Sequence, residues 1–165
     1  MGSPGHQQVA IYKGSLRGGL GMNIKPRLGL LTVGKKNQYQ GEIIRFREFY
    51  QERLAKDDCI ELLLEDKLFF DEHDLVQAAK AMEARGADLI LICVGTWIYP
   101  SMVISAVNDL STPFILYGLS DTIANGNLGA AVQIRYVLQE MGRKFVFLAG
   151  GIVDEENYHV IMKCR

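Results

Sequence analysis

The stretch ADLILICVGTWIY, residues 87 to 99, decides the fold because it joins the longest apolar run of the chain to its only tryptophan. Six apolar residues, 89 to 94, follow one another without polar alternation and are bounded by glycines. Such a run is typical of a strand covered on both faces at the centre of a parallel sheet. Thr96, Trp97 and Tyr99 come directly after it, at the end where open α/β sheets bind ligands. We expect the functional site to begin there.

Composition describes one globular domain with enough chain for a proper core: 165 residues, 48% hydrophobic and 22% charged. Lys and Arg number 18 against 19 Asp and Glu, so the chain lacks the basic excess that a nucleic-acid partner demands. No stretch reaches the roughly 18 to 20 apolar residues that span a bilayer, and no export signal is visible. The three cysteines lack CxxC spacing, which argues against a disulfide framework and fits a cytoplasmic location.

Five strand-like segments alternate with five helix-like segments. Strands are expected over 27–34, 59–64, 89–94, 114–118 and 144–152, the last covered on both faces. Five helices are expected. The first spans 41–56, and the second runs from residue 71 or 72 to Gly86. The third starts at Pro100, the fourth ends before Gly142, and the fifth starts at Asp154. Each of the first four helices has a predicted inner face. In chain order these faces are Ile43, Phe46, Tyr50 and Leu54; Leu75, Ala78, Ala79 and Met82; Val103, Ala106, Val107 and Leu110; and Ala131, Ile134, Leu138 and Met141. This βα alternation predicts a flavodoxin-like α/β/α fold with five parallel strands in the order 2-1-3-4-5.

The first 21 residues hold six glycines, which indicates a leader or an appended segment with a short strand-like core at 9–12. Met22 is a candidate natural start. Residues 22–165 are expected to form the single domain.

In the predicted order, the turns after strands one, three and four meet at one edge: residues 32–38, 95–99 and 118–129. The third turn is long for a strand-to-helix connection, which suggests a function. The substrate-binding residues expected from these turns are Lys35, Lys36, Thr96, Trp97, Asp121 and Asn125.

Each of these candidates has a structural alternative. Lys35 and Lys36 hold an anion or belong to a solvated loop. Trp97 stacks on a sugar or an aromatic ring, or it plugs the end of the core. The polar residues of the third turn bind ligand hydroxyls or serve the turn itself. They are Ser120, Asp121, Thr122, Asn125 and Asn127.

No catalytic constellation is visible in the chain. It has no GxxxxGK[ST] sequence and no GxGxxG after a strand of the predicted sheet. The three histidines, His6, His73 and His159, lie apart from other ligand-type residues, so no metal site is expected. Cys93 is expected to be a core residue, because no histidine is placed near it. The residues alone therefore predict a ligand-binding part without catalytic residues.

Three segments resemble the N-terminal domain of the L-fucose isomerase family, with L-arabinose isomerase as a more distant relative. They are PRLGLLTVG, GADLILICVGTWIYPS and TPFILYGLSDTIANGNLGAAVQIRYVLQEMGRKFVFLAGG. Their order and spacing agree with the family over about residues 25 to 160.

The resemblance implies a parent enzyme that interconverts aldoses and ketoses with Mn²⁺, in the cytoplasm and as a homo-oligomer. The family's metal ligands and acid/base residues lie in later C-terminal domains, so this domain alone is expected to lack cofactor and activity. In the family, a tryptophan at the position of Trp97 packs on the sugar bound in the site of a neighbouring subunit. A basic residue after strand one contacts the sugar; here it is Lys35 or Lys36, where the family typically has arginine.

A different class of protein remains open. A stand-alone cytoplasmic module with this fold would bind a sugar or an anion with the loops at 95–99 and 118–129. A flavin carrier is a weaker alternative, because the turn TVGKKNQ lacks the hydroxyl side chains that flavodoxins offer to the phosphate.

Overall fold

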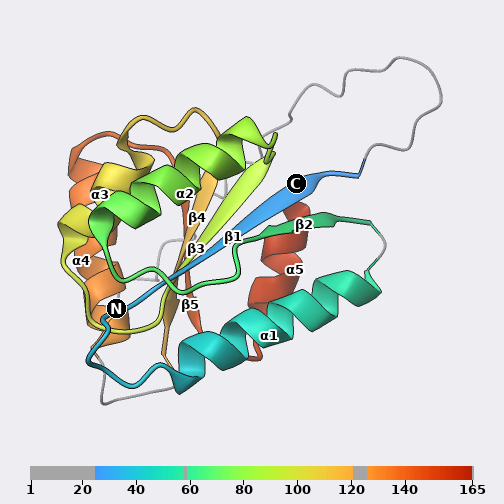
Figure 1. The fold of residues 1–165 in the computed structure, drawn as a ribbon, viewed down its shortest axis with the longest axis horizontal. Helices are drawn as coiled ribbons and strands as arrows, with labels where there is room; N and C mark the ends of the chain where they lie inside the picture. The colour runs from blue at the N-terminus through green and yellow to red at the C-terminus, as the bar shows by residue number, and fades with distance from the viewer. Residues whose placement is uncertain (1–24, 58, 121–125, 165) are drawn as a thin grey trace, which may run out of the picture.

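The computed structural model describes residues 25–57, 59–120 and 126–164, and the structural statements below concern these residues. The predicted leader, residues 1–21 with the segment 9–12, lies outside them. The elements along the chain are β1 (Arg27–Val33), α1 (Gly41–Lys56), β2 (Glu61–Leu64), α2 (Glu72–Ala84), β3 (Leu89–Val94), α3 (Pro100–Asn108), β4 (Phe114–Leu119), α4 (Asn127–Glu140), β5 (Val146–Gly150) and α5 (Glu155–Lys163) (Figure 1).

The five strands form one parallel sheet in the order β2-β1-β3-β4-β5. This confirms the predicted flavodoxin-like arrangement. β3 occupies the centre, where every one of its six residues is buried. The unbroken apolar run therefore reflects a strand with a layer of helices on each face.

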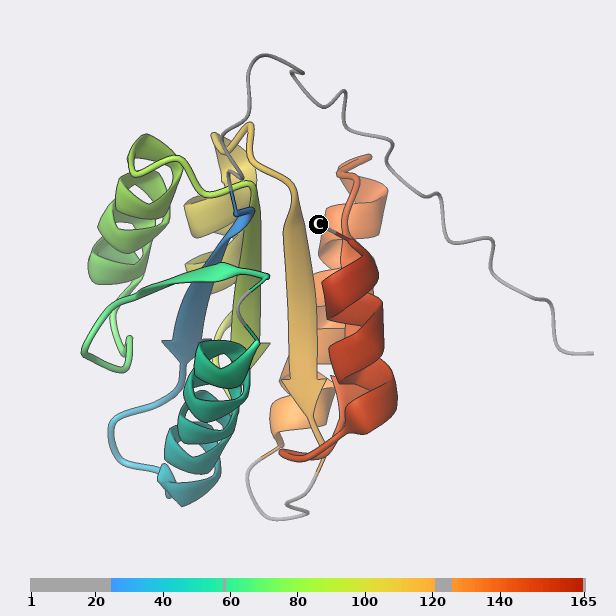
Figure 2. The same cartoon turned by 90° about the vertical axis from the view of Figure 1, so that its right-hand side faces the viewer.

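Two helical layers cover the sheet, each with its own core. On one face, α2, α3 and α4 pack against residues such as Leu31 and Ile92. On the other face, α1 and α5 pack against residues such as Leu30 and Leu91. Figure 2 shows α1 and α5 in front of the sheet. Alternate residues of one strand thus serve opposite cores, which is why the strands carry no polar alternation.

Helix ends follow the predicted signals. Asp71 caps α2 by accepting a hydrogen bond from Asp74 N–H at 3.2 Å, and Asp154 caps α5 by accepting from Asn157 N–H at 2.9 Å. Gly86 takes φ 81° just after α2, a conformation that glycine adopts without strain.

Three predictions about individual segments were wrong. β2 begins at Glu61 rather than at residue 59, because Cys59 lies in a turn, where its N–H donates to Asp57 Oδ1 at 3.2 Å. Met141 is 46% exposed rather than inward-facing, because α4 ends at Glu140 and the chain turns at Gly142 beyond the last core layer. β5 spans Val146–Gly150 rather than 144–152, and it is half-buried rather than covered because it forms an edge of the sheet.

Glu83, near the end of α2, holds the loop that leads into β4. Its Oε1 accepts hydrogen bonds from Ser111 N–H and Thr112 N–H, both at 2.8 Å, and from the Thr112 hydroxyl at 3.0 Å. The Thr112 N–H, aided by the other two donors, stabilises the carboxylate and lowers the pKa of Glu83.

Replacing Glu83 by alanine should lower the free energy of unfolding by about 1 to 3 kcal/mol at neutral pH. Because the folded-state pKa lies below the unfolded one, this contribution is present above an unfolded pKa of about 4.3 and is lost as the pH falls through the folded value. Urea denaturation at a series of pH values measures the difference. Glu140→Ala, at an exposed helix end, is the control, and a difference that does not shrink in acid would contradict the account.

Candidate functional site

The turns after β1 and β3 are tied together at the carboxyl edge of the sheet. Lys35 N–H donates to the Thr96 hydroxyl at 2.7 Å, and Trp97 N–H donates to Gln38 Oε1 at 3.1 Å. Both bonds join residues 59 to 61 positions apart, so they hold two distant loops in one arrangement. The prediction that these two turns meet is confirmed.

The turn after β4 reaches the same place at Gly126. This residue takes φ 58° as the N-cap of α4, and a Cβ built on it would lie 3.3 Å from Trp97 Cδ1. The side of the indole ring therefore lies against the start of α4. Of the polar residues predicted in this turn, Asp121, Thr122 and Asn125 lie outside the described residues.

The two remaining polar residues of that turn are placed by the structure. Ser120 is exposed, and its N–H donates to the Gly150 carbonyl at 2.9 Å. Asn127 is buried, with Oδ1 accepting from Leu128 N–H at 2.9 Å. The Asn127 side chain thus bonds within its own turn, whereas the bond of Ser120 is made by its backbone N–H and not by its hydroxyl.

Three side chains form what we call the aromatic cluster: Lys35, Trp97 and Tyr99. The two rings meet edge to face, with centroids 4.8 Å apart and planes at 73°. Lys35 Nζ lies 5.2 Å from the Trp97 centroid and 6.0 Å from the Tyr99 centroid, within the range of a cation–π interaction. Tyr99 is 65% exposed and Trp97 is half-buried, so the cluster combines apolar ring surface with an ammonium donor at the protein surface.

The structure distinguishes between the two lysines. Lys35 packs over both rings, whereas Lys36 is exposed and its carbonyl accepts from Gln40 Nε2 at 3.0 Å. Thr96 is fully buried, and its hydroxyl accepts the hydrogen bond that positions the Lys35 backbone. Thr96 thus lies beneath the cluster and acts on its geometry.

Gln38 is the residue of this site that sequence reasoning missed, and Tyr99 was noted at the strand end without being assigned to the site. Gln38 lies in the polar turn TVGKKNQ, where nothing in the pattern shows which side chain turns inward. The structure shows it accepting from the Trp97 N–H and thereby fixing the tryptophan backbone. The sequence offered one signal: the backbone N–H of Trp97 needs a hydrogen-bond acceptor, and the polar turn after β1 is close enough to supply it.

The described residues offer no metal site and no reactive thiol at this edge. Among them, no three His, Cys, Asp or Glu side chains gather where they would hold a metal ion. Cys93 is buried in β3, as predicted, and burial raises the pKa of its thiol well above the ordinary value.

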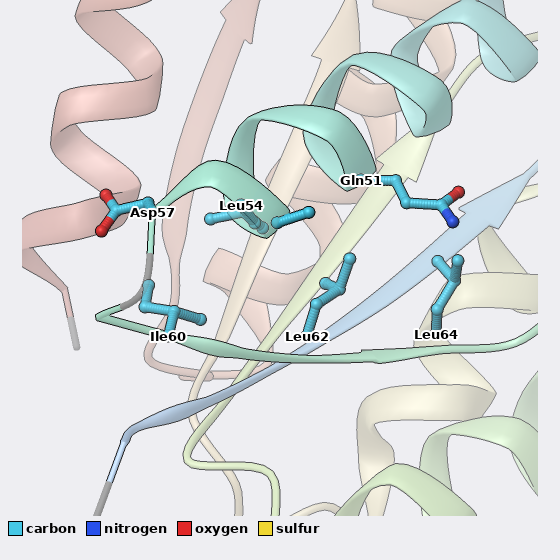
Figure 3. A pocket seen from close by; sticks show the side chains of 7 residues that line it. Gln51, Leu54, Asp57, Ile60, Leu62 and Leu64 are labelled. Carbon is cyan, nitrogen blue, oxygen red and sulfur yellow. The ribbon is translucent and has the colours of Figure 1, made fainter. Parts of the chain in front are cut away.

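A groove of about 290 Å³ lies away from the aromatic cluster, between α1 and β2 (Figure 3). Leu54 of α1 lies opposite Ile60 and Leu62, Gln51 lies opposite Leu64 at one end, and Asp57 lies at the other end. Its lining is mainly aliphatic and includes no aromatic ring. It therefore lacks the combination of ring and polar groups that the carboxyl edge offers.

None of the helices described here combines the length and the apolar character that crossing a membrane requires.

No protein-family model and no curated protein matches the chain. Among solved structures, it is similar to an ABC transporter solute-binding protein from Bacillus halodurans with bound myo-inositol. The TM-score is 0.46 and the identity 11%, over 79% of this chain and 58% of that one. It is also similar to a protein described as a LacI-family transcriptional regulator from Rhizobium etli, with TM-score 0.36 and 11% identity over 76% and 57%. The chain thus spans less than two thirds of either structure, and likeness at this level assigns no function.

Proposed function

We propose that this chain binds a sugar at the carboxyl edge of its sheet, through the aromatic cluster. The observation that carries the proposal is the placement of Trp97. Its backbone N–H donates to Gln38, and Lys35 Nζ lies 5.2 Å from the centroid of its ring. This arrangement is built from two loops that follow neighbouring strands, β1 and β3.

A sugar ring matches this surface chemically. One face of a pyranose carries C–H groups, which pack on the apolar face of an indole, while its rim carries hydroxyl groups. The Lys35 ammonium has three donors and lies over the ring, 5.2 Å from its centroid. The Trp97 backbone is held by hydrogen bonding before any ligand arrives, so little ordering cost remains at binding.

In this proposal Trp97 and Lys35 contact the sugar directly. Gln38 positions the backbone of Trp97, and Thr96 positions that of Lys35. Replacing Trp97 by alanine should weaken the binding of a sugar such as L-fucose or L-arabinose about tenfold or more, which corresponds to about 1.4 kcal/mol. Isothermal titration calorimetry measures the change in affinity. Unaltered affinity in the Trp97→Ala protein would refute the site.

The neighbouring lysines supply a matched comparison for the same measurement. Lys35→Ala removes the ammonium from both rings and should weaken sugar binding several-fold, whereas Lys36→Ala should leave it unchanged. Equal effects of the two substitutions would contradict the assignment of Lys35. Tight binding of inorganic phosphate with no binding of sugar would identify an anion site in its place.

The stand-alone binding module is one setting for this activity. The second candidate is the N-terminal domain of a metal-dependent aldose–ketose isomerase, in which the domain supplies a substrate wall and subunit contacts. The placement of Lys35 near Trp97 supports this candidate, because the resemblance implies that a basic residue after β1 and that tryptophan both contact the sugar. In this setting the Mn²⁺ ligands and the groups that move the proton belong to other domains.

The two settings differ in the size of the natural protein. Immunodetection in the source cell should show a product several times heavier than 18.4 kDa if the domain belongs to an isomerase. A native product of 18.4 kDa would rule out the isomerase and leave the binding module. Chelator-sensitive isomerisation by the purified 165-residue chain would contradict the assignment of catalysis to other domains.

A further inference from the structure

β5 is an edge strand whose outer side has no strand beside it in the described part of the chain. β3 and β4 are buried throughout, whereas β5 has four half-buried residues and an exposed Ala149. Its sequence VFLAG contains no charge and no proline, the two devices that most often protect an edge from pairing. This edge is therefore suited to accept another strand.

The backbone direction shows which groups are available. Gly150 accepts from Ser120 N–H at 2.9 Å, so its backbone groups point toward β4. The backbone N–H and C=O groups of successive residues in a strand point to opposite sides. Those of Phe147 and Ala149 therefore point toward the open side. Asn157 Nδ2 donates to the Ala149 carbonyl at 3.1 Å, so one lone pair of that carbonyl is used within the chain.

An apolar stripe runs along α4 on the same side. Leu128, Val132 and Tyr136 follow one another at four-residue spacing and are 36%, 46% and 63% exposed. Arg135, three residues after Val132, places its guanidinium 5.0 Å from the centroid of the Phe147 ring, beside β5. Leu128 and Val132, which lie close to Arg135 around the helix, therefore occupy the flank of α4 that faces the open edge, and Tyr136 lies further around, away from the sheet.

The charges around β5 are complementary to those of a second β5 in antiparallel orientation. Lys144 precedes the strand and Glu156 follows it, and these are the charges that a second copy can meet. The neighbouring charges are used within the chain: Arg143 donates to the carbonyls of Val107 and Leu110, Asp154 caps α5, and Glu155 pairs with Arg53. An antiparallel copy places the basic start of one strand near the acidic end of the other. The opposite edge, β2, differs because it contains a charged residue: Glu61 lies within the strand and pairs with Arg27 at 2.9 Å.

We propose that two copies of this chain pair through β5, antiparallel, to form a symmetric dimer with one continuous ten-stranded sheet. The two-fold axis lies near residues 147–149 and brings the α4 stripes of both copies together. Such an interface is isologous, so it closes at two copies and leaves no edge for further growth at this side. The proposal is independent of sugar binding.

Sedimentation equilibrium of the full chain over a micromolar concentration series tests the dimer. We expect a mass of twice 18.4 kDa at the higher concentrations. Val132→Lys places a charge in the stripe and should raise the dimer dissociation constant at least tenfold. Met141→Lys is the matched control, because Met141, the residue just after α4, is also 46% exposed and lies half a turn away from Val132 around the helix axis.

A charge exchange tests the orientation. Lys144→Glu should weaken the dimer several-fold, and the double variant Lys144→Glu with Glu156→Lys should restore it. A monomer at every concentration, equal effects of the two α4 variants, or an assembly that grows beyond two copies would overturn the proposal. A double variant weaker than the single one would overturn the antiparallel arrangement.

Discussion

Replacing Phe46 by alanine should lower the free energy of unfolding by about 3 to 5 kcal/mol, the largest effect expected from one substitution in this chain. Phe46 lies on the inner face of α1 and is fully buried. Its ring centroid is 4.5 Å from that of Tyr50 and 4.9 Å from that of Tyr117, so it joins α1 to the sheet. Removing it leaves a cavity that neighbouring rings on rigid elements fill poorly.

Urea denaturation followed by far-UV circular dichroism measures the Phe46→Ala effect. Ile44→Ala is the control on the same helix, because Ile44 is 44% exposed, and it should cost less than about 1 kcal/mol. A loss below 1 kcal/mol for Phe46→Ala would show that the core between α1 and the sheet is not packed as described.

Replacing Gly95 by alanine should cost about 2 to 3 kcal/mol, because the added methyl group has no space. A Cβ at this position would fall on Ile43 Cγ1 and lie 3.0 Å from Ile43 Cβ. These atoms are close to the α1 backbone, so they cannot move aside by rotation of a side-chain end. Gly95 directly precedes Thr96 and Trp97, and the substitution should therefore also displace the aromatic cluster.

The Ile43→Ala substitution provides the test of this explanation, because it removes the atom that the new methyl group meets. Alone it should cost about 2 to 5 kcal/mol as a cavity. Combined with Gly95→Ala, it should cost at least 1 kcal/mol less than the sum of the two single effects. Additive effects would contradict the clash. Gly129→Ala, where a Cβ meets nothing within 4 Å, is the control and should not destabilise.

The arrangement of the sheet could be predicted because its strands carry local signals. The run of residues 89–94 is apolar on both faces, as a central parallel strand requires, and Ile43, Phe46, Tyr50 and Leu54 repeat at helical spacing. Asp71 and Asp154 show as caps in the sequence itself. Such features depend on a few neighbouring residues, so no tertiary information is needed to recognise them.

Features that depend on distant parts of the chain could not be predicted. β5 looks like an interior strand from its residues, and only the strand order leaves it at an edge. Trp97 was identified from its place after β3, but its link to Gln38 joins residues 59 positions apart. The sequence also left Lys35 and Lys36 equivalent, and the direction of each side chain distinguishes them only in the folded loop.

An NMR titration of the ¹⁵N-labelled chain with L-fucose tests the central claim most directly, because it shows where the sugar binds. The account predicts shifts of the Trp97 indole N–H and of the backbone amides of Lys35, Trp97 and Tyr99, with little change around the groove between α1 and β2. Absence of any shift at millimolar sugar, or shifts confined to Gln51, Leu62 and Leu64 in that groove, would contradict binding at the carboxyl edge.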